Sequence, residues 1–431
     1  MPVKKDLHIR IDELTRVEGH GNVVIDLKKG RINTLNLEII ESPRFFEVML
    51  RGRKYDEAHH IMSRICGICA VSHTSASLKA IEAAMKINIS RQATLLRKLA
   101  FCAEVIQSHV LHLYFLVFPD FLGEGSIVPI MSAHPEITKR GLMLKRLANE
   151  ICAKVAGRHI HPISLSPGGV THTPKPSELK KLKAQLEASF DDLEYTVDLL
   201  SKVRVREFTK PREYISLKDR GEYGIYGGVP CTSRKYPLSE KTYAKKLKEY
   251  VVPHSAAKHA KSPKGTYMVG ALARLNNNWA QLGKRARAVS KRLGLSPVCH
   301  NPFHNNTAQL VECFHLTGQA ISLIDELLDM GVKKESLKKP KGFGVGFGLV
   351  EAPRGTLYHE YAINKDGIVE TANCIIPTAQ NLRSIEEDLR EMVPEILDLP
   401  KEEIRKAVES LVRAYDPCIS CSTHIMNVRF E

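Results

Sequence analysis

The pattern of apolar and polar residues changes character along the chain. Residues 21–40 (GNVVIDLKKGRINTLNLEII) alternate apolar and polar positions on both sides of a Lys-Gly turn, which predicts a β-hairpin. From residue 64 to residue 118 the spacing of apolar positions is helical, and the run 92–118 is too apolar to face water on both sides. The pattern therefore predicts strands first and then a long helix buried in a core.

Helical patterns return in the rest of the chain. Ser177 follows THTPKP and is predicted to cap a long helix. Residues 207–240 are rich in Gly, Pro and Tyr and are expected to be irregular, whereas residues 342–377 predict a second strand system around a Lys-Asp-Gly turn. Further helices are expected at 276–294, 306–332, 379–394 and 400–413.

These elements predict one large domain, mainly α with small β elements (α+β). The sequence has no internal repeat, low-complexity tract or linker, so residues 1–431 are assigned to a single domain. Its expected parts are an N-terminal β element at 1–55, a mainly helical core at 56–340, a second β element at 341–378, and C-terminal helices with a metal site at 379–424.

Composition and the N-terminus indicate a soluble chain. Apolar residues make up 43% and charged residues 26% of the sequence, as in globular proteins. Residues 1–14 are charged from the start and lack the apolar core of a signal peptide. The longest apolar stretch, residues 110–118, is interrupted by His112 and is shorter than the ~20 residues of a membrane span. We therefore expect no membrane span.

The formal net charge of +15 invites a nucleic-acid interpretation. The basic residues are spread along the chain, however, and most alternate with Glu or Asp, as on solvated helix faces. Aromatic residues are not interleaved with them in the manner of single-strand binders. A lysine-rich surface or an acidic protein partner explains the charge better, and no nucleic-acid binding is expected.

Four of the ten cysteines form two Cys-x-x-Cys pairs. Cys66 and Cys69 lie in SRICGICAVSH, and Cys418 and Cys421 lie in YDPCISCSTH. Four thiolates suffice for a tetrahedral sulfur site that suits zinc, an iron–sulfur cluster or another soft metal. The six other cysteines stand alone, which fits a reducing compartment: Cys102, Cys152, Cys231, Cys299, Cys313 and Cys374.

A structural zinc site is the simplest alternative for these pairs, and two features count against it. Zinc ribbons usually close over a short loop, whereas nearly the whole chain separates the pairs. Each pair also has charged or titratable neighbours that structural zinc does not need, namely Arg64, His73, Asp416 and His424. Spacing therefore favours a large catalytic cluster but leaves zinc open.

Five motifs occur in order along the chain: RVEGHG (16–21), RFFE (44–47), RICGIC with a later His (64–73), EAPRGTL (351–357) and DPCISCSTH (416–424). Together they resemble the large, catalytic subunits of nickel–iron hydrogenases, essentially from end to end. Details such as ESPRFFE, SHVLHLY, YGIYG, HSAAKHA and RAYDPCISCS are most similar to the cytoplasmic, multimeric subgroup, which includes sulfhydrogenase-like and coenzyme-linked enzymes.

The resemblance implies a nickel–iron centre. Cys66, Cys69, Cys418 and Cys421 would all bind nickel, with Cys69 and Cys421 also bridging to an iron that carries carbon monoxide and cyanide. Soft thiolates suit such a nickel site. The implied reaction is the reversible heterolytic oxidation of dihydrogen.

The resemblance also implies the proton-handling groups. Cys418 would be the first proton acceptor, and Glu18 would relay the proton outward. Arg354 would lie over the open metal position, where a permanently charged guanidinium can polarise the substrate. Asp416 would orient Arg354 through a charge-assisted pair, and Pro353 would help to wall the cavity.

A second metal ion is implied near the C-terminus. Glu47, His424 and the backbone carbonyl of Cys374 would bind magnesium, or iron in its place. His73 would lie behind the bridging cysteine sulfur. Ser108 departs from many membrane-bound and periplasmic relatives, which carry aspartate there, so Arg354 has one fewer negative neighbour.

The histidines that follow Ser108 are less distinctive. His109 and His112 are three residues apart on the apolar helix, as ligands in a di-iron helix bundle could be, but no Glu-x-x-His motif accompanies them. We interpret both as core histidines with hydrogen-bond partners.

The chain needs partners, because it has no other iron–sulfur motif to carry electrons away. An iron–sulfur small subunit is expected, together with flavin-bearing and iron–sulfur diaphorase subunits that serve NAD(P) or another soluble carrier in the cytoplasm. Residues 342–348 (GFGVGFG) fail the dinucleotide-binding spacing. The resemblance also implies nickel chaperones and an endopeptidase that removes residues 425–431 after His424.

Other functions stay open at this point. A membrane-associated energy-converting hydrogenase would share both cysteine pairs, but it generally lacks a cleaved tail. A hydrogen sensor would share them too, whereas the quinone-pocket subunit of respiratory complex I has lost the nickel site. NADP, NAD, deazaflavin, polysulfide and ferredoxin are all candidate acceptors.

Overall fold

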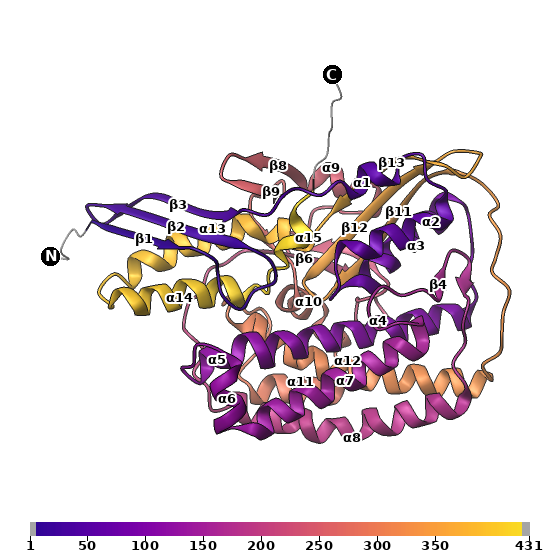
Figure 1. Cartoon of the computed structure of the whole chain (residues 1–431), viewed down its shortest axis with the longest axis horizontal. Coiled ribbons are helices and arrows are strands. Elements are labelled where there is room, and N and C mark those ends of the chain that lie inside the picture. Colours follow the sequence, from indigo (N-terminus) through magenta and orange to yellow (C-terminus); the bar gives the residue numbers. More distant parts are fainter. Residues whose placement is uncertain (1–5, 425–431) are drawn as a thin grey trace.

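The N-terminal sheet forms as the alternating pattern predicts. In the computed structural model, which describes residues 6–424, three antiparallel strands follow in the order β1 (Leu7–Ile11), β2 (Gly21–Lys28) and β3 (Arg31–Ile39). Lys28 pairs with Arg31 across the turn, which confirms the hairpin. The sheet projects from one end of the molecule above two C-terminal helices, α13 (Pro377–Glu395) and α14 (Lys401–Ala414) (Figure 1).

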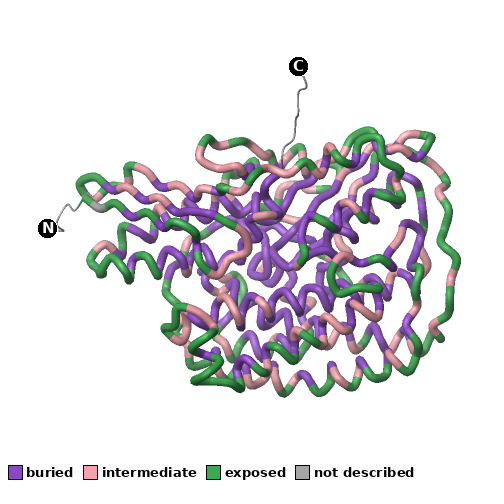
Figure 2. Tube along the Cα trace, in the orientation of Figure 1, coloured by how far each residue is buried: buried purple, intermediate pink, exposed green. Residues whose placement is uncertain are grey.

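Long helices form the layer below the sheets (Figure 1). Helix α4 (Arg91–Leu111) packs against α7 (Pro135–Ala156) and α12 (His304–Met330), and α8 (Pro176–Leu200) packs against both of these. Buried residues concentrate where these helices meet the sheets (Figure 2). The predicted buried helix is therefore the centre of the core.

The apolar helix is longer than the sequence prediction allowed. After α4 the chain continues through a π-helical segment (His112–Val117) into α5 (Phe118–Phe121), so that 31 residues are helical without a break. Length and hydropathy would let this helix cross a membrane, but 83% of its most apolar window is buried inside the protein. Its apolar character is explained by packing in the core.

A second antiparallel sheet lies above the helical layer, as residues 342–377 predict. It consists of β11 (Gly344–Ala352), β12 (Gly355–Ile363) and β13 (Val369–Ile375). Helix α3 (Ala70–Ala84) packs against β11, and a Cβ atom at Gly346 or Gly348 would come within 2.0 Å of a carbonyl oxygen of α3. The glycines of GFGVGFG therefore permit this close packing.

Three local predictions are wrong. The helix expected at 276–294 is interrupted, because α10 (Ala271–Asn278) ends at Asn278, a 3-10 turn spans Trp279–Gln281, and α11 (Lys284–Arg292) begins only at Lys284. Helix α8 begins at Pro176 rather than after Ser177, because proline suits the first helical turn and Glu178 accepts a hydrogen bond from the Lys175 amide at 2.9 Å. Residues 207–240 are not wholly irregular, because they contain β6 (Glu213–Lys218) and β7 (Val229–Thr232), which pair with each other.

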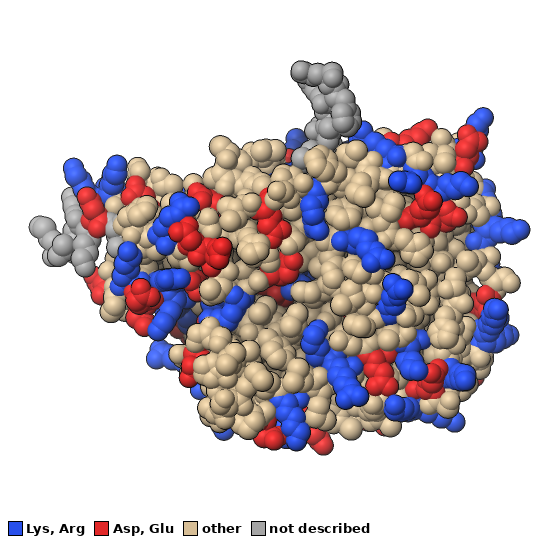
Figure 3. Space-filling model, viewed as in Figure 1, with Lys and Arg blue, Asp and Glu red and all other residues tan. Residues whose placement is uncertain are grey.

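The remaining elements are short or lie at the edges of these layers. They are α1 (Phe46–Leu50), α2 (Tyr55–Met62), α6 (Ile127–Ala133), β4 (Leu165–Ser166), β5 (Gly169–Val170), α9 (Tyr243–Lys246), β8 (Lys248–Val252), β9 (Ser255–Lys261), β10 (Tyr267–Met268), α10 (Ala271–Asn278), α11 (Lys284–Arg292) and α15 (Ile419–Ser422). Basic and acidic side chains are interspersed on the face shown in Figure 3, as solvated helix faces predict.

Two isolated β-bridges join the ends of the chain. Glu18 pairs with Cys418, and Arg44 pairs with His424, both in parallel orientation. Hydrogen bonds support the bridges, since the Ile419 amide donates to the Glu18 carbonyl at 3.0 Å and the Arg44 amide donates to the Thr423 carbonyl at 2.8 Å. The N-terminal motifs are thereby held against the last cysteine pair.

Candidate metal centre and active site

The two cysteine pairs form one cluster. Cys66 follows the short 3-10 helix Ser63–Ile65, Cys69 precedes α3, Cys418 precedes α15, and Cys421 lies within α15. The Sγ atoms of Cys66 and Cys418 are 3.7 Å apart, as are those of Cys69 and Cys421, and Cys418 and Cys421 are 2.7 Å apart. All four sulfurs lie within 4.8 Å of one another, and all four residues are buried.

The pKa values of the cluster indicate that its four thiols do not all ionise without a cation. Hydrogen bonds from the other three thiols lower the pKa of Cys66 well below its ordinary value, and the Ile68 and Cys69 amides also donate to its sulfur at 3.3 Å. The pKa of Cys418 is raised well above its ordinary value by its hydrogen bonds to these thiols and by burial, and burial raises that of Cys421 to about 11. Four thiolates can share this space only around a positive ion, so the donor set fits a soft metal such as nickel.

A small cavity adjoins three of the four sulfurs. It leaves about 10 Å³ for the centre of a water-sized molecule, and it is lined by the buried residues Cys69, His73, Ala352, Arg354, Leu357, Ile376, Pro377, Thr378, Cys418 and Cys421. Cys66 does not line this cavity. Pro353, which was predicted to form part of its wall, does not line it either. Thr378 was not anticipated; its Oγ1 accepts a hydrogen bond from the Cys418 amide at 2.9 Å.

Arg354 brings a positive charge to the cavity wall. Its Nη2 lies 2.9 Å from Asp416 Oδ1, and its Nη1 donates to Ser108 Oγ at 3.2 Å. Its buried Nε and Nη2 have no hydrogen-bond partner among residues 6–424, so the contact of Nη2 with Asp416 is an ion pair without hydrogen-bond geometry. Burial alone would lower the pKa of Arg354, but the charges of Asp416 and Cys418 outweigh burial and hold it well above its ordinary value. The guanidinium is therefore permanently charged.

Asp416 has further partners besides Arg354. Gln309 Nε2 donates to Asp416 Oδ2 at 2.9 Å, and His112 Nε2 lies 3.7 Å from Asp416 Oδ1. His112 Nε2 also hydrogen-bonds the Arg413 carbonyl at 2.9 Å, at the start of the π-helical segment. His112 thus has the hydrogen-bond partners of a core histidine, and it helps to fix the carboxylate that pairs with Arg354.

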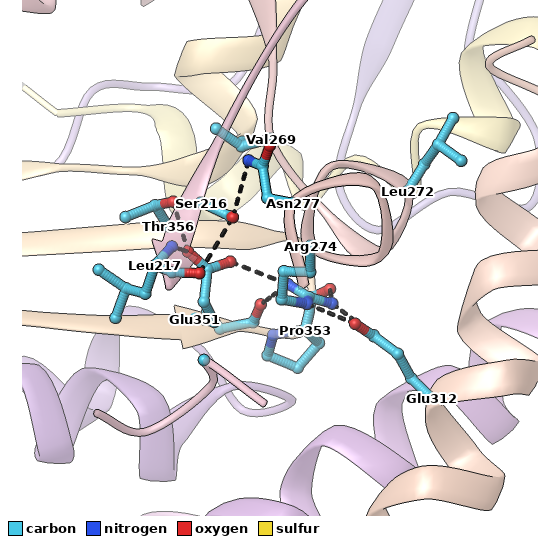
Figure 4. Close-up of polar contacts among 12 residues, drawn as sticks. Ser216, Leu217, Val269, Leu272, Arg274, Asn277, Glu312, Glu351, Pro353 and Thr356 are labelled. Atoms are coloured by element: carbon cyan, nitrogen blue, oxygen red, sulfur yellow. Dashed lines mark hydrogen bonds and ion pairs between the residues drawn. The ribbon is translucent and has the colours of Figure 1, made fainter. Parts of the chain in front are cut away.

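A second buried arginine, Arg274, holds the turn that carries Arg354 (Figure 4). Its Nε and Nη2 donate to the two carboxylate oxygens of Glu312 at 2.6 Å, and its Nη1 donates to Glu351 Oε2 at 3.2 Å. The remaining donors reach the carbonyls of Ala352 and Pro353, both at 2.9 Å. All five N–H donors of Arg274 are used.

The same network accounts for the other histidine on α4. His109 Nε2 donates to Glu312 Oε2 at 2.7 Å, and Tyr223 donates its hydroxyl to Glu312 Oε1 at 2.7 Å. Burial alone would raise the pKa of Glu312, but Arg274 outweighs burial and holds it well below its ordinary value. His109 therefore belongs to a buried ionic network.

Glu18 lies beside the last cysteine pair. Besides the backbone bridge, the Ser420 amide donates to Glu18 Oε2 at 3.1 Å. Glu18 is only partly buried, so part of the residue is accessible to solvent. Ser420 also donates its hydroxyl to Glu41 Oε1 at 3.1 Å. Two carboxylates thus flank Ser420, directly after Cys418 and Ile419 in the chain.

A separate polar site lies near the end of the described chain. His424 Nδ1 is 3.0 Å from Glu47 Oε2, while Glu47 Oε1 and His424 Nε2 are buried without a hydrogen-bond partner among residues 6–424. Cys374 lies on β13, which packs against α1; burial and then the charge of Glu47 raise the pKa of its thiol well above its ordinary value. A buried carboxylate oxygen and a buried imidazole nitrogen, both without hydrogen-bond partners among residues 6–424, could bind a cation.

Two further charged residues near this site were not predicted. Lys258 Nζ lies 2.7 Å from Glu249 Oε2, and Glu249 Oε1 is buried without a partner among residues 6–424. Burial raises the pKa of Glu249, and the charges of Glu47 and His424 also act on it. These residues come from the β8–β9 hairpin, and only their placement in the fold reveals them.

His73 faces the cavity from α3. Its Nδ1 lies 3.4 Å from His359 Nε2, and His359 Nδ1 is 2.7 Å from the Tyr361 hydroxyl. Burial lowers the pKa of His73 to about 3, so the imidazole is neutral beside the cluster. A neutral, hydrogen-bonded histidine can contact a thiolate without adding charge.

Comparison with known proteins decides the family. The family description for nickel-dependent hydrogenase matches residues 44–141 and 239–424, which together include both cysteine pairs, and a HoxL-like description matches residues 8–41. The chain belongs to the nickel-dependent hydrogenases. It is the catalytic large subunit of a nickel–iron hydrogenase, which confirms the resemblance and the α+β fold expected from it.

Individual relatives of this hydrogenase agree along the whole chain. Sulfhydrogenase 1 subunit alpha of Pyrococcus furiosus is 36% identical over 98% of this chain and 99% of its own length. The NAD-reducing hydrogenase HoxS subunit beta of Cupriavidus necator is 28% identical over 96% of this chain and 94% of its own. The crystal structure of an NAD+-reducing [NiFe]-hydrogenase superposes with a TM-score of 0.90 at 28% identity, covering 97% of this chain and 99% of that one.

Proposed function

We propose that the four thiolates hold nickel and that Cys69 and Cys421 also bridge to an iron carrying carbon monoxide and cyanide. The lining of the cavity is consistent with this arrangement, because the proposed bridging residues Cys69 and Cys421 both border it, together with Cys418. When bound, the nickel–iron centre supplies the site at which dihydrogen is split heterolytically and reversibly. The chain's own residues then handle the proton and the shape of the cavity.

Cys418 Sγ accepts the proton first and Glu18 receives it next. The parallel bridge between these two residues and the hydrogen bond from Ser420 to the Glu18 carboxylate support this path. A partly exposed carboxylate at this place can exchange its proton with the surroundings, which is what a relay between a buried thiol and the surface requires.

Arg354 acts from the cavity wall and is oriented by Asp416. Arg354 lines the cavity, is permanently charged and has N–H groups without a hydrogen-bond partner among residues 6–424, so it could polarise dihydrogen bound there. Ser108 takes the place of the aspartate found in other subgroups and supplies a neutral acceptor instead. His73 lies on the same cavity and stays neutral beside the bridging sulfur of Cys69.

The second site binds magnesium, or iron in its place. Glu47 and His424 supply two ligand atoms that are otherwise buried without partners, and the Cys374 carbonyl completes the protein's share. Residues 425–431 lie outside the described residues. We infer that an endopeptidase removes them after His424 and that nickel chaperones load the site before this cleavage.

Electrons leave through an iron–sulfur small subunit. The first cysteine loop supports a docking surface there, because Gly67 is exposed and the neighbouring Ile160 and Ile163 are 42% and 45% exposed. We infer a cytoplasmic enzyme with flavin-bearing diaphorase subunits and NAD(P), or another soluble carrier, as acceptor. The name of the NAD-reducing relative supports the choice of acceptor, and the names of both relatives, as alpha and beta subunits, support a multi-subunit enzyme.

Exchange of Glu18 tests the proposed chemistry most directly. Glu18→Gln keeps the shape and the contact with Ser420, so nickel and iron should stay near one each per large subunit. Viologen-linked hydrogen oxidation should fall by about 10² or more, because a positioned acid–base group contributes roughly that factor. Glu41→Gln is the matched control and should keep most of the activity. Full activity of Glu18→Gln would contradict the relay, and zinc in place of nickel would contradict the centre.

A further inference from the structure

A second group of potential metal ligands lies outside the active site. It consists of His254, His259 and Glu386, whose ligand atoms all lie within 4.8 Å of one another. His254 lies in the turn between β8 and β9, His259 is on β9, and Glu386 is on α13, which packs against β9. None of these residues belongs to the nickel–iron centre or to the site near His424.

Two adjacent residues of β9 contribute to two different sites, the one near His424 and the histidine cluster. Lys258 pairs with Glu249, whose electrostatic neighbours include Glu47 and His424. His259 is the next residue, so its side chain points to the other face of the hairpin, toward Glu386. One short strand therefore contributes to the proposed C-terminal cation site on one face and to the histidine cluster on the other.

The geometry is that of ligands around a small ion. His254 Nε2 lies 2.8 Å from Glu386 Oε1, and His259 Nδ1 lies 4.0 Å from Glu386 Oε2. Ligand atoms about 2.0 to 2.1 Å from a tetrahedral zinc ion are roughly 3.3 Å apart, so the two distances fall on either side of this value. Small side-chain rotations would equalise them.

His259 supplies the observation that a core histidine does not explain. Its side chain is completely buried, and neither ring nitrogen has a hydrogen-bond partner among residues 6–424. Buried polar atoms are nearly always paired, with protein groups, water or an ion.

We propose that His254, His259 and Glu386 bind a divalent zinc ion. Two imidazole nitrogens with one carboxylate form a ligand set that suits zinc, whereas magnesium prefers a set made mainly of oxygen atoms. The side chain of His254 is 22% exposed, which gives the ion a route in and leaves room for a water as fourth ligand.

One positive charge lies near the site. Arg383 Nη1 is 3.8 Å from Glu386 Oε2 and would oppose a cation there. Its side chain is 40% exposed and already pairs with Glu387 at 3.1 Å, so it can stay with Glu387 when the ion binds. The Leu37 amide also donates to Glu386 Oε1 at 3.1 Å, so the ion would fasten β9 to both α13 and β3.

Zinc binding by the purified holoenzyme complex tests the proposal. The complex is dialysed against micromolar zinc chloride and then against metal-free buffer, and zinc, nickel and iron are measured by mass spectrometry. The wild type should retain about one zinc per large subunit, with imidazole ligands in its zinc-edge absorption spectrum. His254→Ala and His259→Asn should lose this zinc while nickel and iron stay unchanged, and His20→Ala, which alters an exposed histidine elsewhere, should keep it.

Either of two results would overturn the proposal. One is a wild type that retains no more zinc than His254→Ala, and the other is full zinc retention by both variants. If His259→Asn does not fold, His254→Ala decides, because its side chain is partly exposed. Retained nickel and hydrogenase activity in a zinc-free wild type would refute this site without touching the proposed hydrogenase function.

Discussion

Arg274 and Arg354 are both buried, both paired with carboxylates, and both attached to the turn between β11 and β12, yet their surroundings differ. Every N–H of Arg274 is used, by Glu312, by Glu351 and by two carbonyls of the turn. Arg354 has one hydrogen bond, to Ser108, and one ion pair, to Asp416, while its Nε and Nη2 have no hydrogen-bond partner among residues 6–424. Both side chains are charged, but only Arg354 has a donor left over at the wall of a cavity.

The difference indicates that one arginine stabilises the turn and the other acts in the active site. A guanidinium with all donors satisfied is fixed in one orientation and fixes the backbone carbonyls that it contacts. The guanidinium of Arg354 is oriented by its ion pair with Asp416 and still has N–H donors without a hydrogen-bond partner among residues 6–424. Arg274 therefore determines where the turn lies, and Arg354 presents the charge from that turn.

The largest effect is expected from Arg274→Lys. Lysine has three N–H donors in place of five and cannot reach Glu312, Glu351 and two carbonyls at once, so buried acceptors lose their hydrogen bonds, at a cost of about 1–3 kcal/mol each in the free energy of unfolding. Burial raises the pKa of Glu351 to about 7 even beside Arg274, so little opposes its protonation afterwards. The midpoint of thermal unfolding and the yield of nickel-loaded complex should both fall.

A matched variant separates this role from general destabilisation. Arg97 is also completely buried, and it pairs with Glu82 at 2.6 Å without contacting the β11–β12 turn. Arg97→Lys should lower stability similarly but keep the activity per bound nickel, whereas Arg274→Lys should lower both. Equal activity per nickel in the two variants would show that Arg274 does not position the turn.

Arg354→Lys should change activity rather than stability. The ammonium keeps the charge but loses the planar group that reaches Asp416 and Ser108 while facing the cavity. Removing one such donor from a catalytic site costs about 10²–10³ in rate. Hydrogen oxidation should fall by that factor with nickel, iron and the unfolding midpoint nearly unchanged; a drop of less than twofold would contradict the role.

A smaller loss is expected when the orienting charge is removed. Asp416→Asn keeps the shape but weakens a charge-assisted pair worth about 1.5–3 kcal/mol, so activity should fall roughly ten- to hundredfold. Gln309→Ala removes the hydrogen bond behind the carboxylate and should give a weaker effect of the same kind. If Asp416→Asn lost its nickel, the residue would be needed for assembly instead.

The smallest effect is expected at Ser108. Its hydroxyl accepts one hydrogen bond, from Arg354 at 3.2 Å, and a single bond of this kind contributes about 1 kcal/mol. Ser108→Ala should reduce the rate about fivefold, and Ser108→Thr, which keeps the hydroxyl, should be close to the wild type. A loss as large as that of Arg354→Lys would mean that Ser108 acts on the substrate itself.

The sequence predicted the parts of the site that lie in motifs. Cys66 and Cys69 share one turn and Cys418 and Cys421 share another, and such spacing is visible without a structure. The strands and the apolar helix were also predictable, because their patterns have periods of 2 and 3.6 residues. Ser177 was misassigned as a cap because Pro176, one residue earlier, starts the helix.

The supporting residues could not be predicted in the same way. Arg274 and Glu312 are charged residues within helical patterns, which is typical of a solvated surface, and only the packing of α10 against α12 buries them. Thr378 and Glu249 likewise come to their sites through folding, from a helix start and a hairpin. The roles of these residues depend on contacts with residues that are distant in sequence, and no local sequence pattern predicts those contacts.

Because the two cysteine pairs are far apart in sequence, the first pair is synthesised long before the second. Cys66 and Cys418 lie 3.7 Å apart in space but 352 positions apart in the chain. At about 5–20 residues per second, roughly 20 to 70 s of synthesis separate them on the ribosome. During that interval the first pair is a free dithiol with neither its partners nor a metal. An oxidant present during synthesis should therefore damage the new chain at Cys66 and Cys69 far more readily than it damages the finished enzyme.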